Sequence, residues 1–197
     1  MSILALTSNT LIGTAAAGNI EYNGQFFGTD SAASRAQLQR ITQGTAVAST
    51  SGTSIDFTAL PAWVKRITVM FSGVSTTGTS QKLLQLGTGS TTYTTTGYVS
   101  NSSFIAGSVG TLAYTNGFNF YNLVTAADTL SGIVVFTNIT GNTWVCSGSV
   151  GQTTGTALTS ITNGSIALGA ALTAVRITTA GGTDTFDAGS INILYEG

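Results

Sequence analysis

The sequence predicts an all-β protein, an antiparallel β-sandwich of jelly-roll type with a small hairpin and helix segment at the N-terminus. Threonine and serine together exceed a quarter of the chain, and 25 glycines accompany a single proline, Pro61. β-Branched threonine suits pleated strands, and glycine suits tight turns and bulges. Short apolar-alternating runs separated by glycine-rich turns recur from Thr45 onward, with no long helical pattern between them. A hydrophobic fraction of 42% supplies enough apolar surface for a core.

The first expected element is a hairpin within residues 18–28. Ile20, Tyr22 and the pair Phe26 and Phe27 flank an Asn-Gly dipeptide at 23–24. This pattern is a strong hairpin signal because both residues tolerate the left-handed conformation of a type I′ turn. So small a hairpin buries little surface alone, and we expect it to pack on a neighbour.

Residues 30–41 are the one stretch with helix-forming composition, and Asp30 or Ser31 could cap a short helix there. An extended linker fits the same residues equally well. The stretch is too short for heptads, so it predicts no coiled-coil stalk. We therefore expect an N-terminal attachment segment at 1–44 and a sandwich domain at 45–197.

Alternation within the runs assigns strand faces. Ile67, Val69 and Phe71 should share the core face of one strand, opposite Arg66 and Thr68. The same pattern holds around Ile177 and in residues 191–196. The runs at 132–136 and 83–84 are apolar on both faces, which predicts that their strands are covered twice, by the opposing sheet and by a loop or another subunit.

Charged residues are scarce: 6 Lys and Arg, 7 Asp and Glu, and no histidine, for a net charge of -1. Such a chain lacks the basic field that gives nucleic-acid binding its main affinity, so we expect no nucleic-acid partner. Without histidine, and with Cys146 as the single cysteine, the usual enzyme and zinc templates fail, and we expect no catalysis, cofactor or metal. Cys146 lies in an apolar run and is expected in the core. No apolar stretch is long enough for a membrane anchor, and no signal peptide is expected.

Several segments carry a family resemblance in their order along the chain. They are residues 63–75, 84–87, 96–98, Trp144 and 181–196, the last containing the block Gly-Thr-Asp-Thr-Phe-Asp-Ala-Gly-Ser-Ile-Asn at 182–192. This series resembles the distal β-sandwich domain of bacteriophage tail-fibre and related virion proteins, and the hairpin at 18–28 resembles a short block that precedes that domain. The resemblance covers about three-quarters of the chain. It implies a homotrimeric projection on the surface of a phage particle (the virion), joined to other virion proteins at tail, baseplate or head, and it implies no reaction.

Two functions of different class remain open. A tail fibre would dock to the particle through the N-terminal hairpin, where Tyr22, Phe26 and Phe27 are the expected contacts, and would bind a host cell-surface polysaccharide. A head fibre or capsid decoration protein would have a purely structural role. For glycan contact, the expected residues are the aromatic side chains that lie among hydroxyl and amide residues between 90 and 121, namely Tyr93, Tyr98, Tyr114, Phe118 and Tyr121.

The carboxylate pair Asp184 and Asp187 is the remaining feature that could carry chemistry. Glycosidases use two acids, and hard cations bind carboxylates. A spacing of three residues in a turn fixes no carboxylate separation, however, and aspartates in such turns ordinarily accept hydrogen bonds from nearby backbone. The pair is therefore not predicted as a site.

Overall fold

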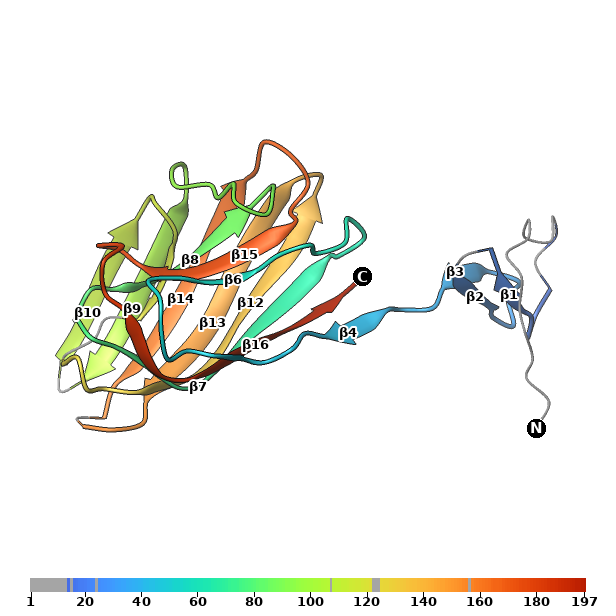
Figure 1. Cartoon of the computed structure of the whole chain (residues 1–197). Coiled ribbons are helices and arrows are strands. Elements are labelled where there is room, and N and C mark those ends of the chain that lie inside the picture. Colours follow the sequence, from blue (N-terminus) through green and yellow to red (C-terminus); the bar gives the residue numbers. More distant parts are fainter. Residues whose placement is uncertain (1–13, 15, 24, 107, 122–124, 156) are drawn as a thin grey trace. The chain divides into compact units, whose positions relative to one another are not determined.

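The computed structural model describes residues 14, 16–23, 25–106, 108–121, 125–155 and 157–197. These divide into two compact units, residues 1–40 and 41–197. The first unit holds a three-stranded antiparallel sheet, and the second holds a two-sheet sandwich (Figure 1). Residues 41–43 pair with the last strand of the sandwich, so the second unit begins at Ile41, four residues before the expected boundary.

The sheet of the first unit has the order β1-β2-β3, with β1 at Ile20–Tyr22, β2 at Phe26–Thr29 and β3 at Arg35–Gln37. The hairpin predicted at Asn-Gly is present. Tyr22 pairs with Phe26, so three residues connect the strands instead of two, and Gly24 lies outside the described residues. A buried ion pair, in which Arg35 Nε lies 2.7 Å from Glu21 Oε2, ties β3 to the hairpin.

The helix considered for residues 30–41 is absent. The Asp30 carboxylate accepts hydrogen bonds from the backbone N–H groups of Ala32 and Ser34, both at 2.9 Å, and so closes a tight turn. The chain then continues as β3, which pairs with β2. A helix of this length gains little stability from its own hydrogen bonds, so pairing with the existing strand β2 is the more stable arrangement. Asp30 therefore holds backbone amides as a helix cap would, but within a turn.

The antiparallel β-sandwich predicted from the sequence is confirmed. The larger sheet has the order β10-β9-β14-β13-β12-β7-β16-β4, with β5 also paired to β16, and the smaller has the order β11-β8-β15-β6. The bounds of the strands in the larger sheet are β4 Ile41–Gln43, β5 Val47–Ala48, β7 Arg66–Thr76, β9 Val99–Ala106, β10 Ser108–Tyr114, β12 Leu130–Thr140, β13 Thr143–Gln152, β14 Thr159–Ala167 and β16 Phe186–Glu196. Those of the smaller sheet are β6 Ile55–Phe57, β8 Lys82–Gly87, β11 Phe118–Tyr121 and β15 Ala174–Thr179. The smaller sheet lies over one face of the larger (Figure 1).

The core lies between the two sheets and follows the predicted faces. Ile67, Val69 and Phe71 of β7 are buried, and Phe71 stacks on Phe120 of the smaller sheet with ring centroids 4.7 Å apart. Cys146 is buried as expected, and burial raises the pKa of its thiol. Among the described residues, no helix is long and apolar enough to cross a membrane.

Hydroxyl groups replace apolar side chains in part of this core. Strand β11 forms one edge of the smaller sheet. The backbone of its Asn119 is hydrogen-bonded to side chains of the larger sheet: the N–H donates to Ser100 Oγ at 3.0 Å, and the carbonyl accepts from Thr162 Oγ1 at 2.5 Å. Ser102 Oγ donates to the side-chain oxygen of Asn119 at 2.5 Å. Buried backbone groups that lack partners are costly, so these hydroxyls explain why serine and threonine face the core on β9 and β14.

The two strands expected to be covered on both faces, β8 and β12, differ in how far they are buried. Every residue of β8 is buried, as predicted. On β12, Val134 and Phe136 face the core, whereas Ile133 on the other face is 49% exposed. Within the described chain, the outward side of β12 is therefore open.

Candidate functional site

Three of the five aromatic residues expected to contact a glycan are core residues. Tyr98, Phe118 and Tyr121 are 1%, 0% and 0% exposed. The Tyr98 hydroxyl accepts a hydrogen bond from Leu86 N–H at 2.8 Å, and the Tyr121 hydroxyl donates to Gln152 Oε1 at 2.7 Å. Burial raises the pKa of Tyr98 to about 12. The interpretation of these three residues as ligand contacts is therefore corrected: their rings fill the space between the sheets, and their hydroxyls are used internally.

Tyr93 and Tyr114 are the two members of that set with accessible surface. Arg176 of β15 lies over the Tyr93 ring, with Cζ 3.9 Å from the ring centroid. The same guanidinium donates to both carboxylate oxygens of Asp56 on β6, at 2.8 and 2.7 Å. This Tyr93, Arg176 and Asp56 cluster presents an aromatic ring, a planar cation and a carboxylate on the outer side of the smaller sheet, and these groups can contact sugar rings and hydroxyls.

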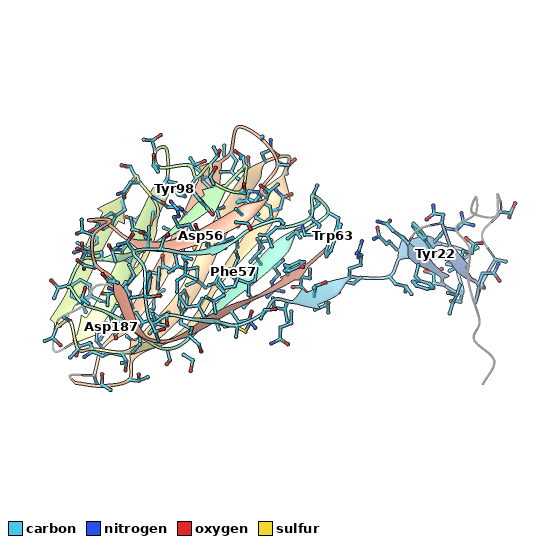
Figure 2. The ribbon with its side chains drawn as sticks, viewed as in Figure 1. Tyr22, Asp56, Phe57, Trp63, Tyr98 and Asp187 are labelled. Carbon is cyan, nitrogen blue, oxygen red and sulfur yellow. The ribbon has the colours of Figure 1, made fainter. Side chains whose placement is uncertain are left out.

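A second candidate site is an open pocket of about 330 Å³ in the first unit, lined by Tyr22, Gln25, Phe26, Gln37, Leu38, Gln39 and Arg40. Tyr22 and Phe26 face each other across the hairpin with ring centroids 5.0 Å apart (Tyr22 is labelled in Figure 2). Leu38 lies over β2 at Gly28, where a Cβ would make an ordinary van der Waals contact of 3.4 Å with the Leu38 side chain. The N–H of Leu38 donates to the Phe26 carbonyl at 2.9 Å, which fixes the wall of the pocket.

This pocket, here called the aromatic pocket, combines apolar walls with a few polar side chains. Phe26 and Leu38 are 46% and 50% exposed, so the pocket walls present apolar surface to solvent. Glutamine amides and the Arg40 guanidinium provide hydrogen-bond donors at its rim. Apolar walls with a few polar groups are typical of ligand pockets. The expected attachment residues Tyr22 and Phe26 therefore meet in one place, whereas Phe27 does not line the pocket and pairs with buried Glu21 and with Gln37.

The sequence predicted only the hairpin side of this pocket and not the side formed by residues 37–40. Residues 37–40 were considered for a helix or linker, so their side chains were not placed beside the hairpin. The alternation of Gln37, Leu38 and Gln39 was a period-two signal that could have indicated an extended segment.

The carboxylate of Asp187 lies at the end of the sandwich opposite Trp63 (Figure 2), and Asp184 precedes it by three residues. Asp184 Oδ2 accepts from Ser80 N–H at 2.9 Å, and Asp187 accepts from the Ser75 hydroxyl. Both are near Lys82, which is 0% exposed and whose ammonium donates to Thr76 Oγ1 at 2.6 Å. The pair therefore has a structural explanation: it binds backbone and hydroxyl groups and offsets a buried cation.

No family model, no curated protein and no solved structure matches this chain. The candidate sites are therefore interpreted from their own geometry.

Proposed function

We propose that this protein is a bacteriophage virion protein that assembles as a short homotrimeric fibre on the particle surface, most simply a tail fibre that attaches to host-surface glycans. The observation that carries the proposal is the pairing of a charge-poor, hydroxyl-rich β-sandwich with a separate small β unit that has its own aromatic pocket. The resemblance of residues 63–75 and 181–196 to distal fibre domains supports the same function. In this proposal, the first unit docks to another virion protein and the sandwich is presented outward.

Glycan attachment would then involve the accessible side chains of the predicted contact set. The accessible members of the predicted contact set are Tyr93 and Tyr114. Arg176 lies over the Tyr93 ring and pairs with Asp56. Contact of a sugar with the stacked Tyr93 and Arg176 side chains, with hydrogen bonds to Arg176 and Asp56, needs no net charge on the protein.

The second candidate is a head fibre or capsid decoration protein without a receptor. The burial of Tyr98, Phe118 and Tyr121 favours it, because three of the expected glycan contacts are used in packing. The two functions share the docking unit and differ in whether the sandwich binds a ligand.

Binding to a panel of purified bacterial envelope polysaccharides separates the two functions. A tail fibre predicts saturable binding to at least one of them, reduced at least tenfold by Tyr93→Ala. Tyr114→Ala tests the other accessible tyrosine, and Thr58→Ala, at an exposed site outside the cluster, serves as the control. Absence of binding across the panel, with the protein still found on particles by immunogold labelling, would favour the structural role. Absence of the protein from particles would contradict both.

The aromatic pocket gives a separate prediction about anchoring. Phe26→Ala should lower the amount of this protein on gradient-purified particles by at least fivefold, because it removes an exposed ring from the pocket wall while disturbing little buried surface. Ile20→Ala is the matched control, since Ile20 is exposed in the same sheet but does not line the pocket. Immunoblotting of purified particles measures the outcome, and equal incorporation of Phe26→Ala and wild type would exclude the pocket as the anchor.

A further inference from the structure

The outward face of five adjacent strands in the larger sheet carries no charged residue. The strands are β10, β9, β14, β13 and β12, and neighbours in this order are hydrogen-bonded. Inward positions such as Phe136, Cys146 and Thr162 are buried, so the alternate positions face away from the core. All thirteen charged residues of the chain lie outside these strands.

The strand registers define the composition of this face, here called the neutral face. One row across the strands consists of Ile133, Ser149, Ile161, Ser103 and Thr111. A second consists of Val135, Ser147, Asn163, Asn101 and Ala113, and a third of Thr137, Val145, Ser165 and Val99. Every side chain in these rows is aliphatic, hydroxyl or amide, and none is aromatic.

Large aliphatic side chains on the neutral face are open to solvent. Ile133 is 49% exposed, Ile161 45%, Val99 65%, Ile105 56% and Val109 72%. Exposed edge strands usually carry a charged residue or a proline, which prevents pairing with other chains. Strand β10 is an edge strand of the larger sheet and has neither. A broad, uncharged β-surface with exposed aliphatic residues is the kind of surface that associates.

We propose that the neutral face is a self-association surface, where one part of the face on each copy packs against another part of the face on the next copy around a threefold axis. The proposal rests on the oligomeric fibre proposed above and assigns the surface that holds it together. A nucleic acid would require cations, a sugar would require aromatic stacking platforms, and a membrane interface would require tryptophan, tyrosine or lysine anchors. The rows provide none of these.

A second copy fits the neutral face on both chemistry and size. Two uncharged faces meet without burying an unpaired charge, and serine, threonine and asparagine side chains can donate to and accept from their own kind. Five strands spaced by about 4.8 Å and about seven residues long give a flat footprint of roughly 500–600 Å² before side-chain relief. Two such footprints total roughly 1,000–1,200 Å², which lies at the lower end of the total area of about 1,200–2,000 Å² that specific interfaces bury.

The native mass of charge-introducing variants tests this assignment. Ile161 lies in the middle of its row, and its side chain faces outward, so Ile161→Lys should leave the fold intact while burying a cation at the interface. We expect its apparent dissociation constant to rise at least 100-fold, with light scattering giving a mass near 20.0 kDa where the wild type is oligomeric. Ser147→Lys, at an exposed position in the second row, provides an independent test if Ile161→Lys does not fold.

Ile20→Lys is the matched control, since Ile20 is exposed on the separate first unit. It should leave the native mass unchanged. Circular dichroism and cooperative thermal unfolding confirm that each variant is folded. Oligomers that survive both Ile161→Lys and Ser147→Lys would overturn the neutral face alone and leave the oligomeric fibre standing. A wild type that is monomeric at every concentration would overturn both.

Discussion

At the scale of single residues, Lys82 is the most unusual feature of the core. It is 0% exposed, and its ammonium donates to Thr76 Oγ1 at 2.6 Å and to the Ser80 carbonyl at 3.2 Å. Desolvation lowers the pKa of Lys82 from 10.5 to about 8, although the nearby Asp184 and Asp187 act in the opposite direction. The hydrogen bonds and carboxylates therefore hold a charge that the interior disfavours.

The shift has a defined consequence for stability. Between about pH 8 and 10.5, the unfolded chain keeps the proton on Lys82 while the folded chain has lost it, so this group makes the free energy of unfolding rise with pH. A fall in pKa from 10.5 to about 8 corresponds to about 3 kcal/mol, at about 1.4 kcal/mol per pH unit.

Lys82→Met should remove this pH dependence. At pH 7 we expect the variant to be as stable as the wild type or more stable, because an apolar chain of similar length fills the site without the cost of burying a charge. The difference in free energy of unfolding between wild type and variant, from denaturant titrations at pH 7 to about 11, should shift by about 3 kcal/mol in favour of the wild type. Lys65→Met, at an exposed lysine, is the control. A loss of several kcal/mol in Lys82→Met at pH 7 would show that the ammonium has a net stabilising role.

Single residues also show where prediction of the site from sequence failed. Aromatic residues among hydroxyls in a β-protein are typical of both a binding loop and a core, and Tyr98, Phe118 and Tyr121 proved to be core. Their burial depends on the arrangement of the two sheets, which local alternation does not specify. Tyr22 and Phe26 were easier to place, because they flank the predicted turn and pair across the hairpin, with ring centroids 5.0 Å apart.

At the scale of elements, close contacts between strands depend on glycine. Gly164 of β14 faces the core beside β9, and a Cβ at this position would lie 2.2 Å from the Val99 carbonyl oxygen and 3.0 Å from the Phe118 ring. Neither the backbone of a central strand nor a packed ring can move easily.

Gly164→Ala should therefore destabilise the sandwich by about 2–4 kcal/mol, through displacement of β14 from β9. Gly169→Ala is the matched control, because nothing lies within 4 Å of a Cβ at Gly169. Thermal unfolding of both variants measures the effect. Equal melting temperatures would mean that β14 and β9 can separate without cost.

The elements also indicate how far the sequence determines the fold. The strand around Ile67, the burial of both faces of β8 and the hairpin at 20–29 follow from alternation and turn chemistry, and all three are confirmed. Residues 30–41 were ambiguous between a short helix and an extended linker, and pairing of residues 35–37 with β2 makes part of this stretch a strand. Strand order lies beyond local pattern: β12 forms a hairpin with β13, which follows it directly, but its other neighbour, β7, is distant in the sequence.

At the scale of the whole molecule, the distribution of charge is the main clue to assembly. All thirteen charged residues lie outside five neighbouring strands of the larger sheet, β10, β9, β14, β13 and β12. The outer face of these strands is therefore uncharged. A surface of this kind is a liability in a monomer and an interface in an oligomer. If folding and assembly are coupled, the apparent melting temperature will rise with protein concentration.

The most direct test of this account is the native mass of the purified protein, measured by light scattering on a sizing column over a range of concentrations. The account predicts a stable trimer of three times 20.0 kDa. A well-folded species of 20.0 kDa at every concentration would contradict it.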